Sequence, residues 1–195
     1  MLFRSGIAPS AIGNGLVLPY LFIYLHEERK ISSLLTGVLA AFGGVIALIA
    51  TPLMGTLIDH WGTKKTLFLG LVVNFFGFIY LAQVRNFWQA LIAIFIEAVG
   101  GIAMWPAQSA LALQHVDEKH REKFFATQFA SLNLGIGIGG VISSLIVNLH
   151  RTSSFQWLYR LDATTFIIYL IVVLPVGAKL LKKESDSSEK LVGPK

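Results

Sequence analysis

The chain has 195 residues, of which 54% are hydrophobic and only 14% charged, and its mean hydropathy is +0.66. Soluble domains carry about 25% charged residues, and the apolar runs here are too long for the core helices of a soluble domain, so we predict an all-α, polytopic membrane protein. The formal charge of +5 does not indicate nucleic-acid binding, because the basic residues lie between apolar runs instead of forming one stripe.

Apolar runs of about 20 residues predict six transmembrane helices that form one bundle over residues 1–178. The predicted spans are 6–25, 34–54, 66–84, 87–112, 124–149 and 161–178. We expect the first span to be retained, because no small-residue cleavage site follows it. Residues 179–195 are rich in Lys, Glu and Ser, which predicts a polar cytoplasmic tail without fixed structure, or the start of a central loop.

The distribution of Lys and Arg predicts that both termini are cytoplasmic. With the N-terminus inside, 11 basic residues are inside and 5 outside, among the 16 of the chain. The inner residues are Arg4, Lys64, Lys65, Lys119, Arg121, Lys123, Lys179, Lys182, Lys183, Lys190 and Lys195, and the outer ones are Arg29, Lys30, Arg85, Arg151 and Arg160. The loops between spans alone give 5 on each side, so the prediction depends on the tail. We therefore expect a multi-pass protein of the cytoplasmic (plasma) membrane, in contact with lipid.

Residues 55–65 form a short charged turn between two apolar runs. The order of its residues, a Gly, then Asp at the fifth position, Gly at the eighth and a closing basic pair, resembles the loop signature of the major facilitator superfamily. The resemblance implies a gating loop near the ends of the second and third spans. Its residues would be Gly55, Asp59, Gly62, Lys64 and Lys65.

Two further stretches are similar to the drug:proton antiporter branch of this family. Residues 15–19 resemble its Gly-to-Pro segment in the first span. Residues 133–140 resemble its antiporter motif in the fifth span, with Ile136 where the family has Pro. Glycines at intervals of four also predict close helix packing, here through Gly135, Gly139 and Gly140, and the second span carries Thr36, Ala40 and Gly44 at the same interval.

The resemblance covers residues from about 10 to 178, which correspond to the N-terminal six-helix half of a transporter with twelve spans. In that fold, two bundles rock around a site between them. The resemblance therefore implies that this chain is one wall of a cavity and needs a second six-helix half as its partner, either in the same polypeptide or as a separate chain.

Glu97 is the one charged residue that we place deep within a predicted span, about 15 Å from its start at 1.5 Å per residue. A carboxylate at that depth is costly unless it faces the bundle interior or a wet cavity. We therefore predict that Glu97 binds a proton or a cationic substrate. The alternative is a structural residue, paired with an amide side chain.

Helical spacing places Gly101, Trp105 and Gln108 on the same face as Glu97. An acid, a gap, an aromatic ring and an amide could together hold an amphipathic organic cation. Asn14, at similar depth in the first span, is a further candidate, because the resemblance implies that the first and fourth spans line the cavity. For Gln108 an interhelical hydrogen bond is the alternative role.

The function that these features predict is secondary active transport of a small organic solute or drug, by proton-coupled alternating access. No enzyme is expected: the His residues lie in or beside loops, and a His-Glu-x-x-His motif is absent. Without Cys, a thiol nucleophile and a Cys-ligated metal are excluded, and we predict no metal site and no cofactor. The alternative is a truncated membrane subunit that interacts with a partner without transporting.

Overall fold

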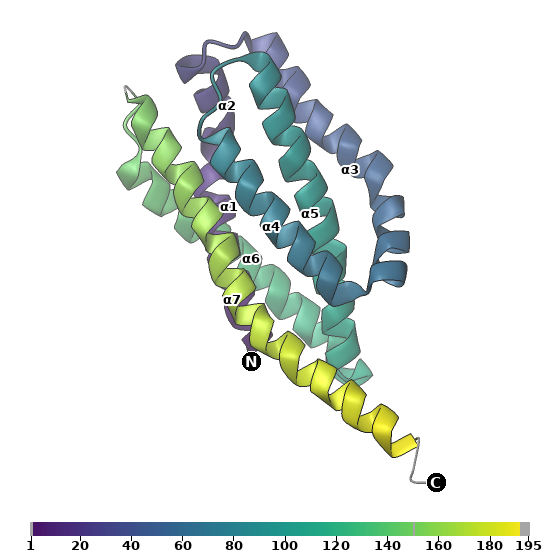
Figure 1. Cartoon of the computed structure of the whole chain (residues 1–195). Coiled ribbons are helices and arrows are strands. Elements are labelled where there is room, and N and C mark those ends of the chain that lie inside the picture. The colour runs from purple at the N-terminus through teal and green to yellow at the C-terminus, as the bar shows by residue number, and fades with distance from the viewer. Residues whose placement is uncertain (1, 150, 192–195) are drawn as a thin grey trace.

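The computed structural model describes residues 2–149 and 151–191, and this part of the chain consists of helices joined by short turns (Figure 1). In chain order the elements are α1 (Leu2–Val17), η1 (Leu18–Tyr20), α2 (Leu21–Ile23), η2 (Tyr24–Glu28), α3 (Ser33–Trp61), α4 (Thr63–Leu81), α5 (Phe87–His115), α6 (Glu118–Ile146) and α7 (Thr152–Leu191). The predicted all-α architecture is thus confirmed.

Within the described residues, five helices are long and apolar enough to cross a membrane. They are α3, α4, α5, α6 and the Thr152–Leu174 part of α7. The first predicted span is instead divided into α1, a 3₁₀ turn, the short α2 and a π-helical turn. Pro19 lies in the 3₁₀ turn η1, where its missing N–H and fixed φ interrupt the α-helical hydrogen bonds.

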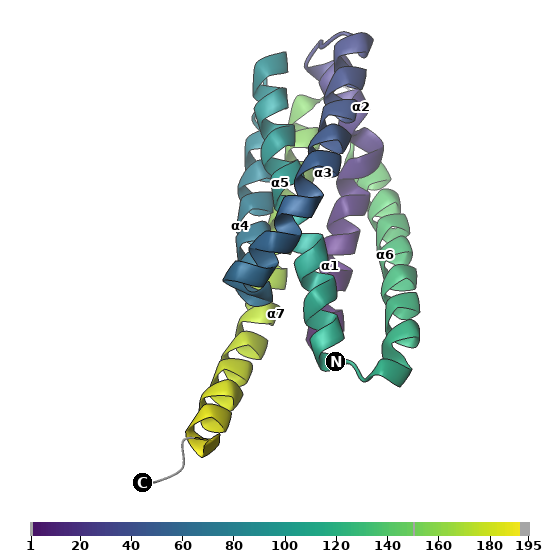
Figure 2. The same ribbon diagram turned by 90° about the vertical axis from the view of Figure 1, so that its right-hand side faces the viewer.

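Neighbouring helices pack in the spatial order α6, α1, α7, α4, α5 and α3. Figure 2 shows α1 beside α6 at one side of the bundle, and α3 across the face of α5 at the other. Because α3 and α6 stand at the two ends of this series, they are the least covered spans, with 11% and 17% of their most apolar windows buried.

The helices alternate in direction, so the turns fall at two ends of the bundle. One end carries Gly62, the α5–α6 turn and the start of α1, and we refer to it as the Gly62 end (Figure 1). The other end carries the turns that precede α3, α5 and α7, and we refer to it as the His26 end.

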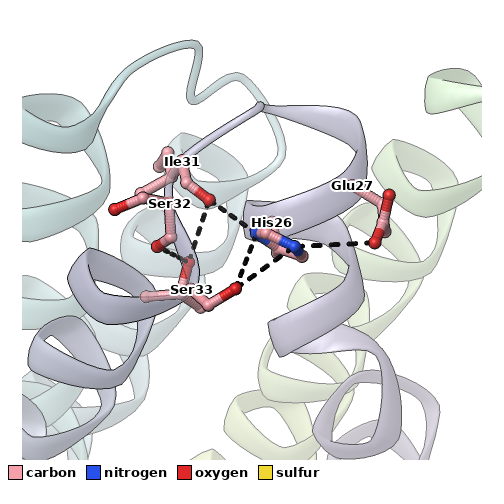
Figure 3. Close-up of polar contacts among 6 residues, drawn as sticks. His26, Glu27, Ile31, Ser32 and Ser33 are labelled. Atoms are coloured by element: carbon pink, nitrogen blue, oxygen red, sulfur yellow. Dashed lines mark hydrogen bonds and ion pairs between the residues drawn. The ribbon is translucent and has the colours of Figure 1, made fainter.

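A compact polar turn joins η2 to α3 at the His26 end (Figure 3). The His26 Nδ1 atom lies 2.8 Å from the Ile31 carbonyl oxygen, and the Ser33 hydroxyl lies 3.3 Å from Nε2. Ser32 caps α3, because its hydroxyl accepts from the Leu35 N–H at 3.3 Å. These bonds satisfy backbone groups that the helix ends would otherwise leave unpaired.

The last helix corrects two predictions. It begins at Thr152, not at position 161, and it continues to Leu191 through the segment expected to lack fixed structure. Arg160 had suggested a loop, but its guanidinium is exposed and lies 5.5 Å from the centre of the Trp157 ring. Because a long basic side chain within a few turns of the start of a span can extend its charge toward the membrane interface, α7 passes through this position without a break.

The sidedness of the bundle can be tested in this Cys-free chain with single cysteines at two exposed positions, Lys119→Cys and Ser153→Cys. If the Gly62 end is cytoplasmic, a membrane-impermeant maleimide will label position 153 in intact cells. It will reach position 119 only after the membrane is permeabilised. The opposite pattern would show that the bundle is inverted, and labelling of both sites in intact cells would show that they do not lie on opposite sides.

Candidate functional site

A groove between α3 and α5 contains Glu97. The cavity in this groove measures about 380 Å³, and its polar or aromatic lining comes from Glu97, Trp105 and Thr51. The rest of its lining is apolar or small: Gly43, Ala47, Ala98, Gly101, Ile102 and Pro106. The indole of Trp105 is partly exposed at 37%, so an acid and an aromatic ring face the same space.

Close packing of α5 on α4 fixes the position of Glu97. A Cβ added to Gly77 of α4 would lie 3.2 Å from the Glu97 backbone nitrogen, and one added to Gly100 would lie 2.8 Å from the Asn74 side chain. The Asn74 side-chain amide is in turn fixed, because it donates a hydrogen bond of 2.9 Å to the Gly70 carbonyl oxygen. Because these glycines let the two backbones approach, the Glu97 side chain emerges from a rigid helix pair.

Gln108 does not join this groove. Its side chain is 1% exposed, and its Oε1 atom accepts a hydrogen bond of 2.7 Å from the Tyr169 hydroxyl of α7. The structure therefore supports the alternative role of Gln108, an interhelical hydrogen bond. Of the residues predicted to share a face with Glu97, Gly101 and Trp105 line the groove and Gln108 does not. Asn14 is half-buried on α1 and is not among the residues that line the groove.

A second carboxylate, Asp162, lies in the interior of the bundle on α7, with 0% of its surface exposed. The prediction that Glu97 is the one charged residue deep within a span is therefore wrong. The error follows from the start assigned to the last span, which put Asp162 at its outer end. The spacing of Phe155, Leu158, Tyr159 and Asp162, all buried, is that of one helical face and could have revealed it.

The predicted gating loop lies at the Gly62 end, but the prediction of a turn over residues 55–65 is wrong. Residues 55–61 form the last turns of α3, which ends only at Gly62, and α4 begins directly after it. Gly55, Asp59 and Lys65 are exposed there, and Lys64 is half-buried. Gly62 ends α3 and precedes α4 with a φ of 86° and a ψ of 148°, a conformation that is essentially restricted to glycine. The Gln114 amide donates to the Thr63 hydroxyl at 3.2 Å, which ties the end of α5 to the start of α4.

Glycines also set the contact between α1 and α6. A Cβ at Gly135 would lie 2.5 Å from the Ala11 Cβ, and a Cβ at Gly139 would collide with the Ile12 carbonyl oxygen. On the opposing helix, a Cβ at Gly15 would collide with the Ile136 carbonyl oxygen.

Other small residues of the predicted packing faces lie in open space. Gly140 has nothing within 4 Å of an added Cβ, and the same is true of Gly44. Ala40 is exposed as well, whereas Thr36 is buried. The predicted face of α3 therefore packs within this bundle only at Thr36.

The groove presents one acidic and one aromatic side chain to the same cavity. The carboxylate and indole of the groove could hold an organic cation, since an aromatic face and an anion both attract positive charge. Within the described residues, no group of three or more His, Asp or Glu side chains comes together as a metal site would require.

Comparison with known proteins gives a consistent family match. The model of the Major Facilitator Superfamily matches residues 5–194. Among curated proteins, the chain is 24% identical to a Na(+), Li(+), K(+)/H(+) antiporter of Planococcus maritimus, over 90% of this chain and 40% of that protein. It is 29% identical to the multidrug resistance protein MdtG of Proteus mirabilis, over 69% of this chain and 34% of that protein. It is 27% identical to the class H tetracycline resistance protein of Pasteurella multocida, over 90% of this chain and 43% of that protein. The chain thus spans about two fifths of the length of these relatives.

The glycine contact of α1 with α6 predicts a sharp difference between two adjacent substitutions. Gly139→Ala should lower the stability of the bundle by about 1–3 kcal/mol, because the new methyl group overpacks a backbone contact. Gly140→Ala is the matched control and should leave stability nearly unchanged, because its Cβ enters open space. Thermal unfolding of the purified chain in detergent measures both. Equal unfolding temperatures for the two variants would contradict this packing.

Proposed function

The chain belongs to the Major Facilitator Superfamily, and on this basis we propose that it is the N-terminal half of a secondary active transporter. The proposed activity is the movement of a small organic solute or drug across the cytoplasmic membrane by proton-coupled alternating access. The observation that carries the proposal is the groove in which Glu97 and Trp105 face one cavity between α3 and α5. A carboxylate beside an aromatic ring suits a cationic or amphipathic solute.

The names of the relatives support the same class of function. Those relatives are called a monovalent cation/proton antiporter, a multidrug resistance protein and a tetracycline resistance protein. Their names refer to different solutes, and the first one names antiport, so they support a transport function without selecting a substrate. We place the binding of the solute at Glu97 and Trp105, with Asn14 as a further contact on α1.

The partner that we propose is a second six-helix bundle, joined in one polypeptide or supplied as a separate chain. In this bundle the two least covered spans, α3 and α6, stand at the ends of the packing series. They expose large apolar side chains, among them Leu48, Leu53, Phe129 and Leu145. A second bundle seated across α3 and α6 would close the groove into a cavity, as alternating access requires.

The topology that we propose has six spans with both termini in the cytoplasm. In it, the segment from α1 to η2 serves as the first span despite its 3₁₀ and π-helical turns. The loop with Asp59, Gly62, Lys64 and Lys65 is then cytoplasmic and gates that side. The alternative function is a membrane subunit that binds a partner without transporting, and it predicts no effect of the groove residues on any solute.

Substitution of the groove carboxylate tests the proposal. In cells that co-express this chain with the C-terminal half of a family member, or in the full-length protein, Glu97→Gln should reduce solute export roughly tenfold or more. The variant keeps the shape of the side chain but removes the charge that would attract a cation or carry a proton. Export of a fluorescent cationic dye, with the amount of protein in the membrane measured in parallel, gives the readout.

Glu122→Gln is the matched control, because Glu122 is an exposed carboxylate at the start of α6, outside the groove. It should export the dye at the normal rate. Normal export by Glu97→Gln, with an unchanged pH dependence, would reduce Glu97 to a structural residue. A failure of the chain to support export with any second half would instead favour the interaction subunit.

A further inference from the structure

Asp162 lies in a part of the bundle that the groove does not reach. It is ten residues past Thr152, the start of α7, and so roughly 15 Å along the helix at 1.5 Å per residue. Its side chain is fully covered, and its neighbours on the same face of α7, Phe155 and Phe166, are buried aromatics. The carboxylate therefore sits in an apolar interior, well away from both ends of the span.

The contacts of Asp162 leave half of its carboxylate without a partner. The Thr165 hydroxyl, which donates to the Asp162 backbone carbonyl at 2.7 Å, also lies 3.3 Å from Oδ1. A Cβ added to Gly13 of α1 would collide with Oδ1. The backbone of α1, without a side chain at this position, therefore packs directly against the Asp162 carboxylate. The Oδ2 atom is buried, and no described group forms a hydrogen bond with it.

An ionised carboxylate in this position would be an uncompensated charge. Burial of an unpaired charge costs several kcal/mol, even after the structure relaxes. The ion pairs of the described residues are those of His26 with Glu27 and of His120 with Asp117, both in exposed turns. A basic side chain therefore does not neutralise Asp162 in this part of the chain.

Tyr159 lies one turn earlier on α7 than Asp162, and its hydroxyl is also buried without a hydrogen-bond partner among the described residues. The remaining elements present uncharged groups to Asp162: Gly13 comes from α1, and α4 stacks Phe78 on Phe166 at 5.5 Å.

The η2 turn approaches from the His26 end. It places the Tyr24 ring 4.9 Å from that of Tyr159, and the Arg29 guanidinium donates to the Tyr24 hydroxyl at 2.8 Å. The charged side chains of α6 lie in its first turns, at 118–123. Polar groups thus run from the half-buried Arg29, through Tyr24 and Tyr159, toward Asp162.

We propose that Asp162 is a proton-binding site of this bundle, separate from the solute groove. The step is a simple protonation: a carboxylate oxygen takes a proton that arrives from water, and no other bond changes. The proton removes the buried charge that the surroundings do not compensate. The carboxyl then needs only weak polar neighbours, which is what Thr165 and Tyr159 provide.

Infrared spectroscopy of the purified 195-residue chain in lipid nanodiscs tests the inference without any transport assay. A protonated, buried carboxylic acid gives a C=O stretching band that disappears as the pH is raised. The chain has four aspartates, Asp59, Asp117, Asp162 and Asp186, of which Asp59 and Asp117 are exposed. Labelling all aspartates with ¹³C at the carboxyl carbon should shift this band in the unmodified chain, which separates Asp162 from Glu97.

Three variants complete the test. Asp162→Asn should abolish the aspartate band, and Asp59→Asn, the control, should retain it. Glu97→Gln should also retain the band, because Asp162 lies outside the groove that Glu97 lines. The isotope shift needs no substitution, so it remains decisive if Asp162→Asn does not fold.

Absence of an isotope-sensitive band at every pH, or its persistence in Asp162→Asn, would overturn the proton site. Loss of the band on addition of Na⁺ at constant pH would overturn it in favour of a metal-cation site. Loss of the isotope-sensitive band in Glu97→Gln would overturn the separation of the proton site from the groove. A dye-export failure with the band intact would reject the proposed transport function and leave the proton site standing.

Discussion

The bundle depends on the close approach of bare backbone on two sides of α1. Gly13 touches the Asp162 carboxylate of α7, and Gly15 meets the Ile136 carbonyl of α6, so an added methyl group at either glycine would collide. Lipid tails are as apolar as leucine, so the helices gain little from hiding apolar surface, and contact of this kind must hold them together. Because α1 joins α6 to α7, the loss of either contact would separate α6 from the rest of the bundle.

The order of the helices explains why the least buried spans are also long and apolar. In the series from α6 to α3, each inner helix has two packing neighbours, whereas α3 and α6 have one main neighbour each. Their free faces carry glycines such as Gly44 and Gly137 with nothing within 4 Å of an added Cβ. Such faces would allow another helix to approach closely, and α3 also forms one wall of the groove, so a partner on α3 could complete both the packing and the cavity.

The sequence was sufficient for the features that depend on local composition. Long apolar runs predicted the helices, and the mid-span position of Glu97 predicted a carboxylate at a cavity. The glycine at position 62 was predicted as part of a short turn, and its φ of 86° explains the choice of residue. What could not be predicted depends on contacts between helices. Gln108 has the right spacing to face the groove, but its hydrogen bond with Tyr169 turns it toward α7.

Asp162 shows why the ends of a membrane span cannot be predicted from the positions of charged residues alone. A charged pair of positions, Arg160 and Asp162, is typical of a helix end, yet the two side chains point to different environments. The guanidinium rests on Trp157 at the outer surface, while the carboxylate faces Gly13 in the interior. Only the packing of α1 against α7 determines which of the two side chains is buried. The result is a bundle with two carboxylates in contrasting settings, one beside an open groove and one sealed among aromatics. The difference comes from the neighbouring helices, because α3 leaves the Glu97 side of α5 open, whereas α1 covers the Asp162 side of α7 with bare backbone.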